Sequence, residues 1–175
     1  MIQNEREIRK ELVMQAVRQM MVAARTAPKA KGIDILEISL VTDDDKHRLS
    51  DEMLKVATEK DMKFFIRDAE NIMQADAVLI IGTRQKQQGL NCAHCGYITC
   101  ESKPAATPCA INTVDVGIAI GSACAKAADL RVDTRVMFSA GYAAQRLNML
   151  GSDCNCVMAI PVSASSKNPF FDRKT

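Results

Sequence analysis

The chain has 175 residues, long enough for one domain whose core needs no disulfide bonds to hold it together. Its 23 basic and 21 acidic residues leave a formal net charge of +2 and are mixed along the sequence, so no charge pattern favours binding to nucleic acid or to a membrane surface. Charged residues near the N-terminus argue against a secretory signal. The sequence has no apolar run long enough to predict a membrane span. We therefore expect a cytoplasmic protein whose seven cysteines stay reduced or bind metal.

The first third of the chain is expected to alternate between helix and strand. Apolar residues recur every three or four positions over residues 4–26, a spacing that predicts an amphipathic helix. The run ILEISLV over residues 35–41 predicts a buried strand. Thr42 is expected to cap a second helix that reaches about Thr58.

A third helix is expected to begin after Asp61, which is a favourable N-cap residue. A short apolar strand over residues 77–83 then precedes a stretch rich in cysteine. The residues of the third helix that we expect to face the core are Phe64, Phe65, Ile72 and Met73.

Beyond the cysteine-rich stretch the pattern returns to regular elements. Asn112 or Thr113 is expected to cap a long fourth helix. A strand over residues 135–139, a short helix over residues 142–150 and a last strand over residues 155–162 follow. Helices inserted between strands indicate a sheet covered by helices.

Four cysteines, Cys92, Cys95, Cys100 and Cys109, lie close together in the sequence GLNCAHCGYITCESKPAATPC. Thiolates select zinc or iron–sulfur clusters. Structural zinc sites usually join two short ligand pairs, whereas this stretch has one such pair, Cys92 and Cys95, and two single cysteines. Gly96 lets the backbone turn closely around a sulfide-containing cluster. We therefore predict a [4Fe–4S] cluster, with zinc as the alternative metal.

The remaining cysteines and the two histidines are given structural roles. Cys124 is expected to be a small buried residue of the fourth helix, and Cys154 and Cys156 are expected to pack in the core. His94 is expected to lie exposed between two cluster ligands, and His47 on a solvated helix face. No catalytic acid or base can be assigned from the sequence.

Several segments resemble a known family. The stretch from Cys92 to Cys109, the segment NTVDVGIAIGSACAKAADLRVDTRVMFSAGYAA and the tail IPVSASSKNPFFDR are similar to uncharacterised proteins described as containing a ferredoxin domain. The resemblance covers essentially the whole chain and implies a four-cysteine iron–sulfur module. The gap before Cys109 is shorter here than in many such modules, which makes Cys109 the least secure of the four ligands.

A second resemblance concerns the scaffold. The segments RQMMVAARTAPKAKGIDILEISLVTDDDKHRLS and DVGIAIGSACAKAADLRVDTRVM resemble flavin-dependent nitroreductases, in which FMN lies at a dimer interface and basic residues near both termini hold its phosphate. NEREIR stands where that family has an R-S-x-R segment. The resemblance implies a homodimer. The residues that it suggests for the flavin phosphate are Lys29, Lys31, Lys167 and Arg173.

Taken together, these observations predict one α+β domain over residues 1–175, with a nitroreductase-like mixed sheet flanked by helices and a cysteine-rich metal-binding loop over residues 90–110. The leading hypothesis is a cytoplasmic electron-transfer protein that serves a redox partner protein or a small-molecule electron acceptor. The first alternative is an FMN-dependent oxidoreductase. The second is a zinc-stabilised interaction domain without redox chemistry.

Overall fold

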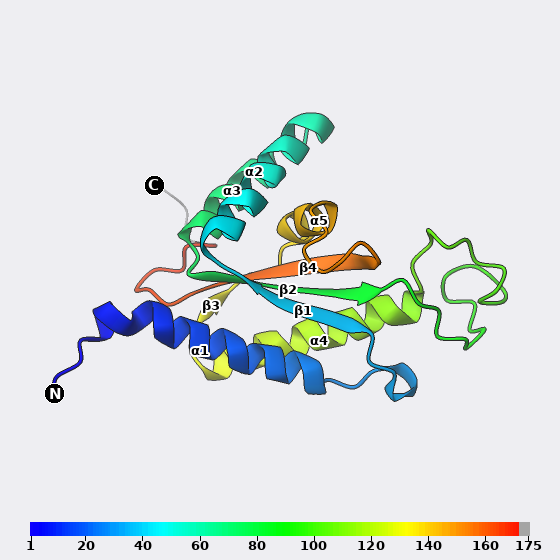
Figure 1. The fold of residues 1–175 in the computed structure, drawn as a ribbon, viewed down its shortest axis with the longest axis horizontal. Helices are drawn as coiled ribbons and strands as arrows, with labels where there is room; N and C mark the ends of the chain where they lie inside the picture. Colours follow the sequence, from blue (N-terminus) through cyan, green and yellow to red (C-terminus); the bar gives the residue numbers. More distant parts are fainter. Residues whose placement is uncertain (172–175) are drawn as a thin grey trace.

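A four-stranded sheet with helices on both faces forms the body of the protein (Figure 1). The computed structural model describes residues 1–171. The strands are ordered β1-β2-β4-β3, and each described pair is antiparallel, where a mixed sheet was expected. The elements in chain order are α1 (Glu5–Thr26), η1 (Ala30–Gly32), β1 (Leu36–Val41), α2 (Asp43–Lys60), α3 (Phe64–Gln74), β2 (Ala77–Arg84), α4 (Ala110–Asp129), β3 (Asp133–Thr134), α5 (Phe138–Arg146) and β4 (Cys154–Ser163).

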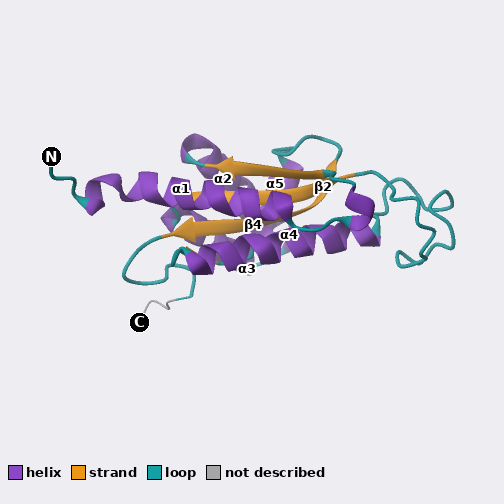
Figure 2. Cartoon of the chain, turned by 90° about the horizontal axis from the view of Figure 1, so that it is seen from below, coloured by secondary structure: helices purple, strands orange, loops and turns teal. Residues whose placement is uncertain are grey.

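The core is divided by the sheet into two layers. On one face, Leu79 and Ile81 of β2 pack against α1 and α4, which lie side by side along the sheet (Figure 2). On the other face, Val78 and Ile80 pack against α2, α3 and α5. Alternate residues of β2 therefore pack into opposite layers, as the two-residue period of a strand requires. The strand is buried along almost its whole length.

Several boundaries differ from those expected from the sequence. Asp61 has a left-handed backbone conformation and ends α2 instead of starting α3, whose N-cap is Lys63. Phe65 is fully buried, whereas Phe64 is 41% exposed, because the N-terminal end of α3 points only one of the two rings inward. The expectation that Phe64 packs in the core is wrong.

The segment after α4 also differs. Of the strand expected over residues 135–139, only a single bridge between Met137 and Ala159 is present, and the short strand β3 precedes it. The helix expected from residue 142 begins at Phe138, and its Ser139 hydroxyl donates a hydrogen bond of 2.6 Å to the buried Asp68 of α3. The fourth helix begins at Ala110 with Cys109 as its N-cap, earlier than expected.

The cysteine-rich segment extends beyond one end of the sheet. Residues 85–109 contain no helix or strand and connect β2 to α4, at the right of Figure 1. Their path turns sharply at Gly89, Asn91, Ala93 and Gly96, which all have positive φ. Among residues 1–171, no helix is long and apolar enough to cross a membrane.

Gly141 allows α5 to pack directly on β4. A Cβ atom at this position would lie 2.2 Å from the carbonyl oxygen of Val157 and 2.6 Å from the Cα of Met158, and neither backbone atom can move freely. We therefore expect Gly141→Ala to lower the free energy of unfolding by about 2 kcal/mol or more, measured by urea denaturation.

The matched control is Gly121→Ala, a glycine to alanine change in the middle of α4 whose new methyl group meets no atom within 4 Å. Measured at a protein concentration at which the chain is monomeric, it should raise the free energy of unfolding by about 0.5–1 kcal/mol through backbone entropy. This condition is needed because Gly121 is exposed on α4 and could lie in a dimer contact. Equal effects of the two substitutions would refute the tight α5–β4 contact.

Candidate metal-binding loop

The two ends of the cysteine loop are tied together by Asn112 in the first turn of α4. Its side-chain nitrogen donates to the Lys86 carbonyl oxygen at 2.5 Å, and its side-chain oxygen accepts from Gln88 at 2.9 Å. Lys31 donates to the Gln88 carbonyl oxygen at 3.1 Å from the neighbouring η1 turn. Asn112 is 2% exposed, so this tie is a buried polar link rather than a surface contact. Asn112 therefore holds the loop instead of capping the helix.

The four cysteines of the loop are free, half-buried thiols. In the described part of the chain, no three His, Cys, Asp or Glu side chains are gathered in an arrangement that could hold a metal ion. The structure thus brings Cys92, Cys95, Cys100 and Cys109 onto one loop, but it does not bring their sulfur atoms to a common centre.

Cys100 has surroundings that favour a thiolate. The backbone of Asn91 lowers the pKa of this thiol, and the backbone groups of Gly89 and Leu90 and the charge of Lys103 act in the same direction against a smaller effect of burial. Asn91 also accepts the Cys100 N–H through its side chain at 2.8 Å. Donors directed at sulfur are the contacts that proteins use to tune iron–sulfur clusters. The donor set around Cys100 therefore fits a cluster ligand.

Lys103 and Cys109 form the end of the loop where it enters α4. Lys103 is 7% exposed, and its ammonium group donates to the carbonyl oxygens of Pro104, at 3.2 Å, and Thr107. Cys109 is the N-cap of the helix, and no side chain caps the free N–H groups of the first turn. The end of the loop is therefore rich in positive charge and in N–H donors.

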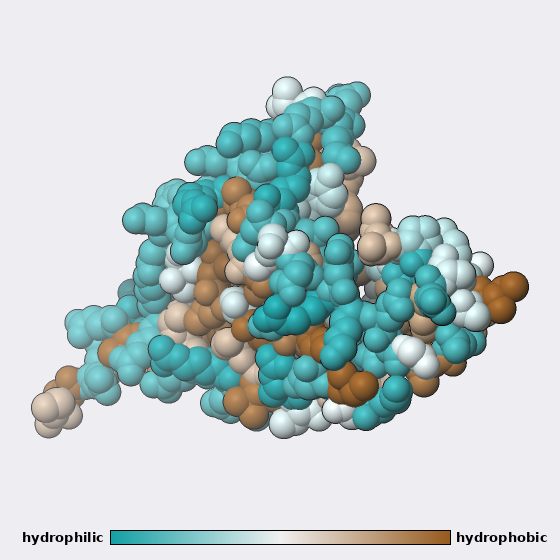
Figure 3. Space-filling model, turned by 45° about the vertical axis from the view of Figure 1, so that its right-hand side comes forward, coloured by the Kyte–Doolittle hydropathy of each residue, from teal (hydrophilic) through white to brown (hydrophobic). Residues whose placement is uncertain are grey.

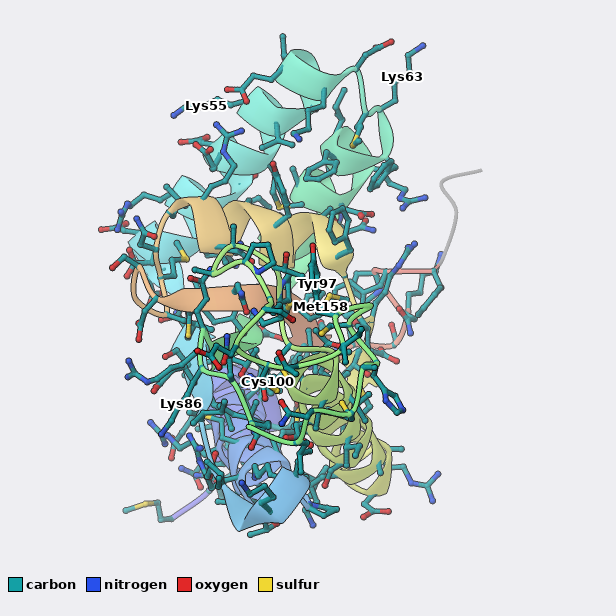
Figure 4. The ribbon with its side chains drawn as sticks, turned by 90° about the vertical axis from the view of Figure 1, so that its right-hand side faces the viewer. Lys55, Lys63, Lys86, Tyr97, Cys100 and Met158 are labelled. Atoms are coloured by element: carbon teal, nitrogen blue, oxygen red, sulfur yellow. The ribbon has the colours of Figure 1, made fainter. Side chains whose placement is uncertain are left out.

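A cavity of about 340 Å³ lies at this end of the loop, between its two stems and the start of α4. Its lining includes three cationic residues, Arg84, Lys86 and Lys103, together with Cys109 and Asn112. Figure 4 faces the loop and shows Cys100 on it and Lys86 near its base.

Comparisons with known proteins identify the family. Residues 105–173 match the family described as "Uncharacterized protein containing a ferredoxin domain". An uncharacterized protein of Archaeoglobus fulgidus is 40% identical over 183 residues, covering 99% of this chain and 98% of its own. The chain belongs to this family. The matched residues contain Cys109 but not the other three cysteines of the loop, so the similarity across the whole loop comes from the archaeal relative.

Solved structures identify the fold of this ferredoxin-domain family member. A nitroreductase with bound FMN from Bacteroides fragilis superposes with a TM-score of 0.63 and 13% identity over 92% of this chain and 82% of its own. A nitroreductase with bound FMN from Desulfitobacterium hafniense superposes with a TM-score of 0.62 and 13% identity, over 87% of this chain and 78% of its own. An FMN-dependent nitroreductase from Clostridium difficile superposes with a TM-score of 0.57 and 16% identity, over 87% of this chain and 76% of its own. The nitroreductase-like fold expected from the sequence is confirmed, although identities this low show the fold alone.

The lysines suggested for a flavin phosphate do not meet within one chain. Lys29 is engaged with the carbonyl oxygens at the end of α1, including that of Ala27 at 2.9 Å, and Lys31 holds the loop stem. Lys167 lies in the tail after β4, at the opposite end of the sheet from η1 (Figure 1). Arg173 lies outside the described residues.

A different pair of basic residues lines a hollow at the start of α1. Arg6 and Arg9 line it together with Glu5, and Ala164, Ser165 and Ser166 of the segment after β4 complete the lining. Arg9 is paired with Glu5, with Nε 2.6 Å from Oε1. These arginines belong to the NEREIR segment, which was noted in the sequence only as a departure from the nitroreductase pattern. The nitroreductase resemblance had marked NEREIR as a loose substitute for the R-S-x-R segment, but its grouping with Ser165 and Ser166 depends on the tertiary fold.

Of the other cysteines, Cys154 is buried as expected, whereas Cys124 and Cys156 are only half-buried, less than the sequence predicted. Burial raises the pKa of the Cys124 and Cys156 thiols. Both histidines are exposed as expected. His94 is exposed, with Nδ1 2.9 Å from the Cys92 carbonyl oxygen, and His47 is exposed on α2.

The thiols of the metal-free protein should differ in reactivity. Burial raises the pKa of Cys154 to about 11, whereas the pKa of Cys100 is lowered. At pH 8 only about one Cys154 in a thousand is a thiolate, the form that reacts. We expect iodoacetamide to label Cys100 at least about a hundredfold faster than Cys154, measured by mass spectrometry of tryptic peptides.

The pH dependence provides a second readout. Between pH 8 and 9 the labelling rate of Cys154 should rise about tenfold, and that of Cys100 should rise less because more of it is already ionised. A Cys154 rate as high as that of Cys100 would contradict the assigned environments. Cys100→Ser should leave the Cys154 rate unchanged.

Proposed function

We propose that this protein is a cytoplasmic electron-transfer protein that binds one [4Fe–4S] cluster through Cys92, Cys95, Cys100 and Cys109. The observation that carries the proposal is the group of four thiols on one loop outside the sheet, with backbone donors and a buried ammonium group around Cys100. Membership of a family described as containing a ferredoxin domain supports it. When bound, such a cluster accepts and donates single electrons.

The loop has the properties that ligation requires of it. Its glycine and left-handed positions let successive residues turn toward one centre, and its stems are held fixed by Asn112. Four thiolates add negative charge to the centre, and Lys103 offsets part of that charge from inside the loop. The loop supplies the ligands, and the sheet supplies a rigid base.

The position of the loop suits electron exchange with another molecule. The loop projects from one end of the sheet, and Ile98 on it is 83% exposed (Figure 3 shows the molecule turned toward this side). A redox partner protein or a small-molecule acceptor can approach the cysteines there without any change in the sheet.

Replacing single loop cysteines tests the cluster. Anaerobically purified protein should contain about four iron and four sulfide per chain, with an absorption band near about 400 nm that dithionite bleaches. Cys92→Ser, Cys95→Ser and Cys100→Ser should lose most of the iron and sulfide, because each removes one ligand. Cys109→Ser should do the same and decides whether Cys109 is the fourth ligand.

The matched controls are Cys124→Ser and Cys156→Ser, which change half-buried cysteines outside the loop and should keep their iron. Stoichiometric zinc without colour would replace the proposal with a structural, partner-binding zinc domain. If all variants contained as much iron as the unaltered protein, the iron would be bound outside the cysteine loop.

A second candidate function is FMN-dependent oxidoreduction. The observations that favour it are the fold shared with nitroreductases that bind FMN and the hollow lined by Arg6, Arg9 and Ser165. Guanidinium groups and hydroxyl groups are suitable partners for a phosphate. Lys29, Lys31, Lys167 and Arg173 remain a prediction that would need residues from two copies of the chain.

FMN titration followed by flavin fluorescence tests this function. Arg6→Gln should weaken FMN binding about tenfold, the effect of losing roughly one charged hydrogen bond. Arg9→Gln should weaken it less, because Arg9 is already paired with Glu5. Arg18→Gln, on the exposed side of α1, should leave the affinity unchanged. Failure of FMN to bind the unaltered protein would remove this candidate and leave the cluster proposal standing.

We also propose that the protein forms a homodimer through the outward face of α4. Val114 is 54% exposed and Ile118 is 40% exposed, and Gly117, Gly121 and Ala125 lie exposed on the same helix. This apolar face has small residues that permit another helix to approach closely.

A further inference from the structure

We propose that the cavity between the stems of the cysteine loop and the start of α4 binds a small molecule through a carboxylate or phosphate group. The site is separate from the hollow at Arg6 and Arg9, which lies at the other end of the sheet. The binding itself does not depend on a metal being present in the loop.

The charge of the lining favours an anion. The lining residues include three cations and no acidic residue. Arg84 is already paired with Glu37 at 2.6 Å and with Asp153 at 2.7 Å. Among the described residues, the ammonium group of Lys86 has no hydrogen bond or ion pair. Lys86 is exposed at the mouth and is therefore available to a ligand.

Lys103 provides a second, buried cation in the lining. Its partners in the described residues are the carbonyl oxygens of Pro104 and Thr107, and no carboxylate pairs with it. A buried charge without a counter-charge is costly, and a nearby anion relieves that cost. An anion in the cavity would supply that counter-charge.

The start of α4 adds donors. Cys109 and Asn112, at the N-cap and in the first turn of this 20-residue helix, both line the cavity. The first hydrogen bond of the helix runs from the Thr113 N–H to the Cys109 carbonyl oxygen at 3.1 Å, which leaves the preceding N–H groups without partners in the helix. Free N–H groups and the helix dipole attract an anion, and at this cavity they lie near two ammonium groups that have no carboxylate partner among the described residues, Lys86 and Lys103.

The size and remaining chemistry indicate a small organic molecule rather than a single ion. A volume of about 340 Å³ is at the lower end for small-molecule sites. The amide side chains of Gln85, Gln87 and Asn155 also line it and can hydrogen-bond to a polar ligand. An anchored molecule would lie beside Cys109, a position suited to an electron acceptor; that consequence alone rests on the proposed function.

Isothermal titration calorimetry with inorganic phosphate and with succinate tests the site, at constant ionic strength and on anaerobically purified protein. We expect saturable binding of at least one of the two probes. Lys86→Gln should weaken it about tenfold, the effect of losing one charged contact. Lys63→Gln, an exposed lysine next to α3 at the far end of the helical layer, removes the same charge and should have no effect.

Lys103→Gln should weaken binding further, and circular dichroism checks that this buried substitution leaves the fold intact. Binding of phosphate alone indicates that the natural ligand is a phosphate ester, and binding of succinate alone indicates a carboxylic acid. Binding of both probes indicates a site that accepts either kind of anionic group. Lack of saturable binding, or equal loss in Lys86→Gln and Lys63→Gln, overturns the proposal. Iron content measured on the same samples separates this result from failure of the cluster proposal.

Discussion

The architecture depends on the burial of β2 on both faces. Its alternating side chains supply both core layers, and its antiparallel pairing with β1 and β4 fixes the register of the three longest strands. Because β2 ends at Arg84 beside the start of α4, the connection between them must leave and re-enter the body at one edge. The cysteine loop occupies that connection, so the rigid strand and helix hold both of its ends.

The loop is anchored by polar contacts rather than by apolar packing. Asn112 links both sides of its base, Lys31 joins the η1 turn to it, and Lys103 holds the final turn from inside. Such contacts define the path of the stems but leave the tip, with its exposed residues and left-handed turns, free of the core. The tip of such a loop can rearrange around a bound group without changing the packing of the sheet.

The scaffold and the loop favour different chemistries. The fold is shared with proteins that bind FMN, whereas the four thiols and the family description favour an iron–sulfur cluster. A fold does not determine a function, and the residues of the site carry more weight here than the scaffold does. Cations line hollows at both ends of the sheet, with Lys86 and Lys103 at one end and Arg6 and Arg9 at the other, where Glu5 pairs with Arg9.

The sequence by itself determined the helices with strong periodicity, the strands β1, β2 and β4, the cysteine loop and both family resemblances, because these depend on local spacing and residue type. It predicted a buried β1, but this strand lies at the edge of the sheet, and only its Leu36 and Val41 are buried. It failed at Phe138 and Ser139, where a helix replaces the end of a predicted strand and Ser139 donates a buried hydrogen bond to Asp68 of the distant helix α3. It also assigned Asn112 to a cap and Lys31 to a flavin, whereas both hold the loop stem. Only the tertiary structure decided these roles, since a buried polar side chain takes its partner from whichever segments the fold brings beside it.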